Sequence, residues 1–262
     1  MLNSRELKGH ARQVLRRRLM PLLLTAAAFL VVDYLINYLA NELSGLNAWS
    51  RELIRHMDAY IQQIGEAPSA EELEEIYTNL IPSMPEVGSF ARGAFAVALS
   101  WLINLMSVPL TAGYCWHMIQ ESRGVATHVG SLLHGFQVTL KTLAVTLLIS
   151  LLVALGGLLF VIPGIILAFR YSLAIYILMD DPSKGVIQCM EESGALMRGN
   201  KWRLFKLELS FIGWNILESL ITTIVGLPIF KLWLTPYSTL AHTAFYNEVL
   251  GLPPTTETQP EM

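Results

Sequence analysis

The stretch from Val161 to Trp214 constrains this chain most, because two apolar runs there flank a polar segment. The first run is interrupted at Pro163-Gly164, carries Arg170 and ends at Asp180-Asp181-Pro182. The second run follows a short basic and aromatic segment after Gly199. This order predicts a membrane span that carries a charge, an elbow at the membrane surface and a return into the bilayer. We therefore expect a multi-span membrane protein.

The composition supports a membrane location. Of the 262 residues, 53% are hydrophobic and only 15% are charged, and the mean hydropathy is +0.47. A soluble domain carries roughly 25% charged residues, so most of this chain is expected to avoid water. The net charge of -3 is too small to predict a nucleic-acid partner. Cys115 and Cys189 have no paired spacing, which predicts free thiols rather than a disulfide or a metal site.

The N-terminal segment from Asn3 to Arg18 has the periodicity of a short amphipathic helix. Bases and apolar residues recur on two separate faces: Arg5, Lys8, Arg12 and Arg16, and Leu7, Ala11, Val14 and Leu15. The pattern is typical of an interfacial helix on an anionic bilayer, so it predicts anionic lipids as a partner. The apolar stretch Leu19 to Ala40 then has about the 20 residues that a span requires. Its length and Asp33 favour a retained helix over a cleaved signal peptide.

The charge distribution predicts how the chain is oriented. Residues 41–92 hold nine acids and three bases, whereas residues 1–18 hold six bases and one acid. Basic segments stay on the cytoplasmic side, so the N-terminus is predicted inside and the acidic loop outside. The acidic face of the loop is either a cation site or a solvated surface, and the latter is the favoured interpretation.

Two apolar segments follow the loop. Ala94 to Ile119 is predicted to be the second span, with a kink at Pro109. Val138 to Met179 is longer, and a single straight helix of that length would measure about 63 Å, twice the hydrocarbon core. We therefore expect a hairpin that turns at Gly156-Gly157 or at Pro163-Gly164, although no polar loop separates its two halves. Its two ends, at Lys141 and Asp180, should lie near the cytoplasmic face.

A cytoplasmic elbow is predicted over 181–203. Asp181 and Pro182 have the residue types of an N-cap and a first helical position, and the helix should stop at Gly199. Lys201, Trp202 and Arg203 are the expected interfacial anchors. A fifth span, a sixth helix and a disordered tail are expected at Leu204–Phe230, Tyr237–Leu250 and Pro253–Met262. The predicted fold is a single all-α domain over 1–262, a bundle of about six spans with both termini in the cytoplasm.

Three ionisable residues are predicted to lie deep in the membrane. Arg170, Asp33 and Glu218 each fall roughly 10 to 14 residues from a cytoplasmic helix end, about 15–21 Å deep. Charges at that depth are costly and usually face a partner or a cavity. Arg170 is therefore expected to pair with Glu218 or with Asp33 as a candidate intramembrane charge cluster. A structural ion pair is favoured over a transport or binding site.

The sequence has none of the common catalytic motifs. It contains no Walker loop, no G-x-S-x-G elbow and no H-E-x-x-H, and its six histidines are scattered. We therefore expect no enzymatic activity, no cofactor and no metal. Asp180-Asp181 is compatible with a divalent ion, but a helix cap already explains Asp181.

Short motifs in the second half and at both ends carry a family resemblance. They are Arg5-Glu6-Leu7-Lys8, Ala11-Arg12, Ile162-Pro163-Gly164-Ile165-Ile166, Tyr171-Ser172, Tyr176-Ile177-Leu178, Asp180-Asp181-Pro182, Ser193, Leu196-Met197, Gly199-Asn200-Lys201-Trp202, Leu204-Phe205, Leu209 to Trp214, Pro236-Tyr237 and Phe245-Tyr246. They resemble a bacterial family of integral membrane proteins known as domain of unknown function 975. Asp181 stands where an asparagine is expected. The resemblance implies a polytopic bacterial membrane protein and implies no activity.

Two classes of function follow from the sequence. The favoured class is a non-enzymatic protein of the cytoplasmic membrane that acts through lipid contacts, or through contacts with a membrane-protein partner or a second copy. The alternative is a transporter for a small solute, such as an anion, built around Arg170, Asp33 and Glu218. An intramembrane enzyme is the third candidate. A water-filled cavity at Arg170 would favour transport.

Overall fold

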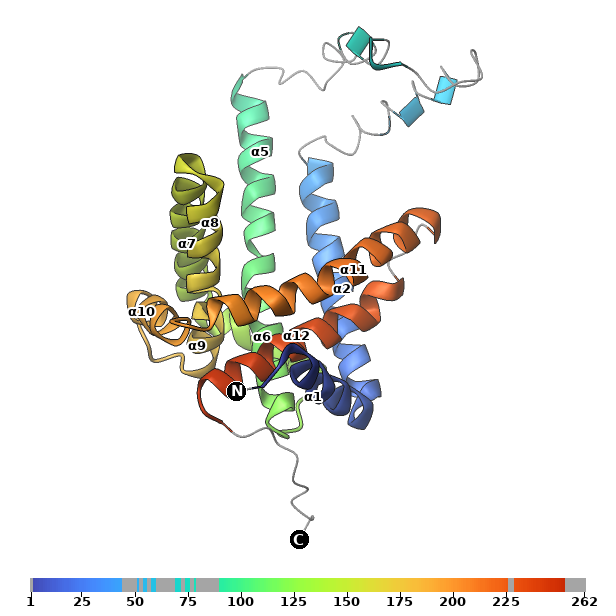
Figure 1. The fold of residues 1–262 in the computed structure, drawn as a ribbon. Helices are drawn as coiled ribbons and strands as arrows, with labels where there is room; N and C mark the ends of the chain where they lie inside the picture. The colour runs from blue at the N-terminus through green and yellow to red at the C-terminus, as the bar shows by residue number, and fades with distance from the viewer. Residues whose placement is uncertain are drawn as a thin grey trace. The chain divides into compact units, whose positions relative to one another are not determined.

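The computed structural model describes residues 2–43, 90–225 and 229–252, together with scattered positions between 51 and 78. Every regular element in these residues is helical, which confirms the all-α prediction (Figure 1). The chain divides into two compact units, Met1–Val31 with Val108–Met262, and Val32–Ser107. Most of the predicted acidic loop and the predicted disordered tail lie outside the described residues. The single-domain assignment stays a prediction.

The helices follow the chain in the order expected from the sequence. The larger unit holds α1 (Ser4–Arg17), α6 (Ser107–Ser122), the 3-10 helix η2 (Val129–Val138), α7 (Thr139–Leu159), α8 (Val161–Tyr171), α9 (Ala174–Asp180), α10 (Val186–Leu196), α11 (Lys201–Val225) and α12 (Ile229–Val249). Helix α2 (Leu19–Leu43) begins in this unit, and α5 (Phe90–Leu105) belongs to the smaller one. Helices α5 and α6 are separated only at Met106, just before the predicted kink at Pro109.

Four helical segments in the described residues are long and apolar enough to cross a membrane. They are Leu19–Glu42, Ala98–Ser122, Val129–Leu158 and Val161–Asp180. Helices α11 and α12, predicted as the fifth and sixth spans, are not among them. The structure is therefore compatible with a membrane protein, whereas the count of six spans is not confirmed.

Helix α1 is amphipathic as predicted, but its apolar face has a different partner. Leu7, Ala11 and Leu15 are buried, and α1 packs against α12 and α11. The face that was expected to rest on the bilayer is therefore covered by protein, and that part of the prediction is wrong. An amphipathic pattern shows only that one face avoids water, and it does not distinguish lipid from protein.

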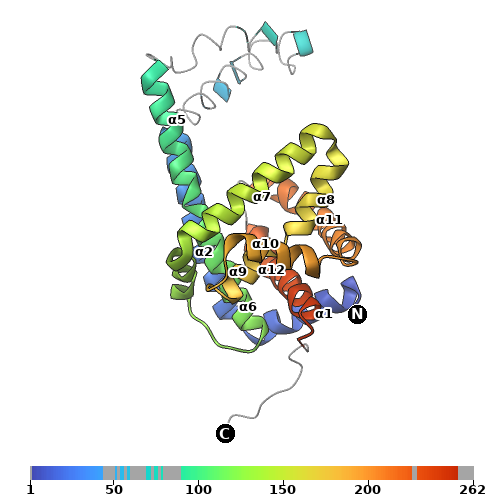
Figure 2. The ribbon, with the colours of Figure 1, turned by 90° about the vertical axis from the view of Figure 1, so that its left-hand side faces the viewer.

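Helices α7 and α8 form the predicted hairpin and lie side by side (Figures 1 and 2). The chain turns at Phe160, whose backbone is extended with φ -160° and ψ 146°. The turn therefore lies between the two predicted glycine-containing pairs rather than at either one. The glycines serve close packing instead, because a Cβ added to Gly164 would lie 2.9 Å from the backbone nitrogen of Gly157.

The elbow differs from the prediction at Asp181. Helix α10 begins at Val186 with Gly185 as its N-cap, whereas Asp181 ends α9. The Asp181 carboxylate accepts hydrogen bonds from the Ser183 N–H at 3.1 Å and the Ser183 hydroxyl at 2.6 Å. An aspartate turn and a helix N-cap use the same short contact from carboxylate to N–H, so the sequence did not separate them. Helix α10 ends at Leu196 with Met197 as its C-cap, before the predicted stop at Gly199, which lies with φ +78° in the turn that leads to α11.

The glycine contact generates a stability prediction. Gly164→Ala should lower the free energy of unfolding by about 1–3 kcal/mol, because the new methyl group overlaps the α7 backbone. Gly157→Ala is the matched control, since a Cβ at Gly157 meets nothing within 4 Å. The control should be neutral or stabilise by up to about 1 kcal/mol. Denaturant unfolding in detergent measures both variants, and equal stability of the two would contradict the packing shown for the hairpin.

Candidate functional site

A bidentate ion pair and its hydrogen-bonded neighbours join α6, α9 and α12 in the larger unit. Arg123, directly after α6, donates two parallel hydrogen bonds to Asp180, at 2.5 and 2.9 Å. Its Nε also donates to the Asn247 side chain at 3.1 Å, and the Tyr246 hydroxyl donates to Asp180 at 3.1 Å. The Asn247 amide donates in turn to Ser122 at 2.8 Å. The bidentate geometry fixes the ends of three helices against one another.

A second ion pair joins the end of α1 to α6. Arg18 Nη1 lies 3.1 Å from the Glu121 carboxylate, which is fully buried. Glu121 also accepts hydrogen bonds from the N–H and the hydroxyl of Thr127, both at 2.9 Å. The His117 Nδ1 lies 2.6 Å from the Thr127 hydroxyl and 2.7 Å from that of Ser131. A buried carboxylate with these partners is satisfied within the protein.

A third ion pair joins the start of α11 to the end of α12 and also contacts the segment before α1. Arg203 at the start of α11 donates to Glu248 near the end of α12 at 2.6 Å, and also to the Leu2 carbonyl at 2.8 Å. Glu248 accepts a further bond from the Leu2 N–H at 2.5 Å. The segment before α1 is therefore held beside the end of α12.

These contacts form one connected set, which we call the ion-pair network: Arg18–Glu121, Arg123–Asp180 and Arg203–Glu248. Glu121 and Arg123 lie two residues apart, and Glu248 follows directly after Asn247, which binds Arg123. The network therefore holds both ends of α1. Lys141 of α7 donates to the carbonyls of Pro182 and Lys184 at 2.6 and 3.1 Å, so the hairpin base lies at the turn that follows Asp180.

The predicted charge cluster is not assembled in the larger unit. Arg170 is exposed and packs over Gly194 of α10, and its guanidinium lies 5.5 Å from the Tyr171 ring. Glu218 is half-buried and accepts a hydrogen bond from Thr222 at 3.0 Å. The ion pairs of the described residues do not join Arg170 to Glu218, so that pairing is wrong. Asp33 is half-buried and belongs to the smaller unit.

The three predicted interfacial anchors have different environments. Trp202 is 63% exposed and stacks on Phe205, and Lys206 lies over its ring at 5.7 Å. Lys201 is half-buried at the start of α11. Arg203 belongs to the ion-pair network and is not free to anchor the chain in headgroups.

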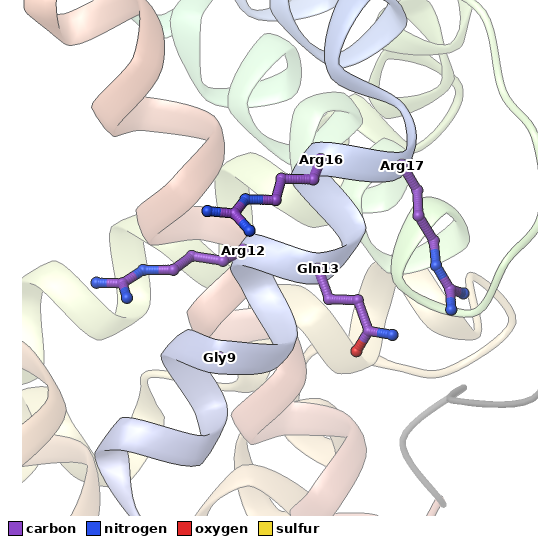
Figure 3. A pocket seen from close by; sticks show the side chains of 5 residues that line it. All are labelled: Gly9, Arg12, Gln13, Arg16 and Arg17. Atoms are coloured by element: carbon purple, nitrogen blue, oxygen red, sulfur yellow. The ribbon is translucent and has the colours of Figure 1, made fainter.

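The outward face of α1 carries a basic groove. Gly9, Arg12, Gln13, Arg16 and Arg17 line a groove of about 440 Å³ (Figure 3). The three arginines and Gln13 are exposed, and Figure 3 shows their side chains extending away from the helix axis. Arg12 lies 5.6 Å from the Tyr237 ring. In the part of the chain that the structure describes, no ion pair joins these arginines to a carboxylate.

The cysteines and the aspartate pair considered for thiol or metal chemistry are buried or bound by neighbouring side chains. Cys115 and Cys189 are buried free thiols, as predicted, and loss of solvation raises the pKa of Cys189. Asp180 is held by Arg123 and Tyr246, and Asp181 by Ser183. Within the described ranges, no group of three or more histidine, cysteine or acidic side chains is arranged to hold a metal ion.

The comparison with known families agrees with the sequence resemblance. The family described as Protein of unknown function (DUF975) matches residues 94–252. The matched region covers more than half of the chain and includes the hairpin, the elbow, α11 and α12, so the chain belongs to this family. No curated protein and no solved structure matches it.

The Arg123–Asp180 contact generates the second prediction. Arg123→Met should lower the free energy of unfolding by about 1–3 kcal/mol, because it leaves a half-buried carboxylate without its charged partner. Combining it with Asp180→Leu should recover part of the loss. The control is Lys184→Met, which breaks a local ion pair with Glu192 and should cost less than about 1 kcal/mol. Equal losses for Arg123→Met and Lys184→Met in thermal unfolding would contradict the importance of the contact.

Proposed function

We propose that the chain is a non-enzymatic membrane protein whose α1 helix contacts anionic lipid headgroups through its basic groove. The observation that carries this proposal is the groove itself, which Arg12, Arg16 and Arg17 line with exposed side chains. Guanidinium groups donate planar, paired hydrogen bonds that suit phosphate oxygens. A lipid phosphate therefore fits the chemistry of this surface.

Some arginines pair with carboxylates and others do not, and this difference supports the proposal. Arg18, Arg123 and Arg203 are paired with carboxylates inside the ion-pair network. The arginines of the groove have no such partner in the described residues, and their charge remains available to a ligand outside the chain.

The mode of contact follows from how α1 is packed. Its apolar face is buried against α12, so lipid binding by α1 would depend on charge and not on insertion of apolar side chains. Contacts of this kind weaken as salt screens them over about 8–10 Å at moderate ionic strength. The proposed contact is therefore electrostatic and reversible.

Within the larger unit, the Arg170–Glu218 pair that the transport alternative could use is not formed. That alternative required Arg170 with Glu218 or Asp33, and Arg170 instead lies against α10 with its side chain exposed. The absence of catalytic motifs from the sequence favours a non-enzymatic role. Transport around these three residues stays a prediction from the sequence.

Lipid retention tests the proposed function. Replacing Arg12, Arg16 and Arg17 together with glutamine should weaken binding of phosphatidylglycerol by up to about 100-fold at low salt, since each base near an anionic surface contributes about 1 kcal/mol. Native mass spectrometry of the detergent-solubilised protein, titrated with phosphatidylglycerol or phosphatidylcholine, measures this loss. Binding of phosphatidylcholine should not change.

The control is Arg198→Gln, which removes an exposed arginine that belongs to the elbow and not to α1. It should retain phosphatidylglycerol as the parent does. Unchanged binding in the triple variant, with the same unfolding temperature as the parent, would contradict the proposed role of the groove.

The proposed membrane orientation has its own test. With the N-terminus in the cytoplasm, reporter domains fused after Leu80 should read as external, and those after Gly199 or at the C-terminus as cytoplasmic. The basis is the excess of bases in residues 1–18 and of acids in residues 41–92. A cytoplasmic signal from the Leu80 fusion would overturn this orientation.

A further inference from the structure

The outer half of the α7–α8 hairpin contains no polar side chain. The last polar residues before the turn and the first after it are Ser150 and Arg170, each ten residues from Phe160. We call the segment between them, residues 151–169, the distal hairpin. Its turn holds no residue suited to water or to a layer of headgroups.

The distal hairpin is exposed and packs mainly on itself. Leu158 is 85% exposed and Phe160 72%, while Gly164 is the one buried residue of α8 and lies against Gly157. Other exposed apolar side chains continue along both helices: Leu151, Leu155, Val161, Ile162, Ile165 and Ile166. In the first half of α7, Thr142 and Val145 are fully buried, whereas Leu140 and Leu147 are exposed. The distal hairpin therefore presents an apolar surface on its outer sides.

A polar and aromatic belt lies against the base of the distal hairpin on its α8 side. Arg170 packs over Gly194, and its carbonyl accepts a hydrogen bond from Ser193 at 2.9 Å. On the α11 side, Phe169 meets Phe205, which stacks on the exposed Trp202. Exposed tryptophan beside basic residues is typical of the boundary between membrane and water. This belt therefore marks Arg170 as an interfacial residue and not as a residue of the bilayer centre.

The length of the distal hairpin matches one leaflet. Ten helical residues extend about 15 Å, which is half of a hydrocarbon core of about 30 Å. A leg of that length that starts at the belt ends near the middle of the bilayer. To reach the opposite headgroups, each leg would need about 20 residues beyond the belt.

The backbone of the turn is adapted to a site without water. The Phe160 N–H donates to the Gly156 carbonyl at 3.1 Å, and the Gly164 N–H donates to the Phe160 carbonyl. Pro163 has no N–H, which removes one of the donors that a helix start leaves unpaired. Unpaired backbone groups are strongly disfavoured in hydrocarbon, so these features reduce the penalty of burying the turn there.

We infer that the α7–α8 hairpin is a re-entrant element that enters the acyl chains of one leaflet and returns to the same side. This inference rests on the proposed membrane location. It assigns lipid acyl chains as the partner of the exposed distal surface and places Phe160 near the bilayer midplane. Although both legs are long and apolar enough to be spans, neither one then crosses the membrane.

Single cysteines test the depth of the turn. In a background with Cys115→Ala and Cys189→Ala, Phe160→Cys is compared with Glu71→Cys in the predicted external loop and Arg198→Cys in the elbow. Phe160 makes no described ring contact and is exposed, and Leu158→Cys serves as a second position. A membrane-impermeant maleimide is applied to intact spheroplasts and to inside-out vesicles.

We expect the external control to react in spheroplasts and the elbow control in inside-out vesicles. The cysteine at Phe160 should react on neither side until detergent is added. A fluorophore attached there in liposomes should be quenched most by lipids with nitroxides deep in the chain. Labelling of Phe160→Cys from outside, or strongest quenching by a headgroup nitroxide, would show two full spans and overturn the inference.

Two other outcomes would distinguish a failure of the re-entrant hairpin from a failure of the lipid assignment or of the membrane location. Disulfide crosslinking between two copies at Phe160, without quenching by lipids, would assign the distal surface to a second copy and overturn the lipid assignment. Release of the parent chain from membranes by alkaline carbonate would overturn the proposed membrane location itself. Stable membrane retention combined with a shallow Phe160 overturns only the re-entrant hairpin.

Discussion

Buried charged side chains are costly unless they are paired, and this constraint explains how the larger unit is built. Charged side chains at its helix ends form the ion-pair network. Arg123 binds Asp180 through two hydrogen bonds, and the neighbouring ion pairs connect α1, α11 and α12. The apolar segments extend away from these ends. Removing the network would leave carboxylates buried and the helix ends without fixed partners.

The same constraint accounts for the two faces of α1. Both ends of the helix are held by the network, through Leu2 with Glu248 and through Arg18 with Glu121. Its apolar side is buried against α12, and its arginines are left on the outer side. A helix held in this way exposes its basic groove beside the ion-pair network. Anionic headgroups would contact the protein at this level.

Much of the fold could be predicted, because apolar length and helical periodicity are local properties of a sequence. The α1 helix and the α7–α8 hairpin were predicted from such patterns, whereas α10 ends at Leu196, before the predicted stop at Gly199. Partners were not predictable in the same way, since Arg123 and Asp180 are 57 residues apart. Their positions at the ends of apolar segments were the available signal. The expected Arg170–Glu218 pair is not formed, and counting residues along one helix left out α10, which packs beside Arg170.

The central claim is that the ion-pair network lies in the headgroup and water layer, outside the hydrocarbon that begins at the belt beside Arg170. Spin labels at Gln13, His128 and Arg198, which are exposed and adjoin the network from α1, the α6–α7 connection and the elbow, test it most directly. Power-saturation electron paramagnetic resonance in lipid nanodiscs compares collisions with a water-soluble nickel chelate and with oxygen. The account predicts that all three labels are accessible to nickel and lie at the same headgroup depth. A label at any of these positions that is reached by oxygen but shielded from nickel would contradict it.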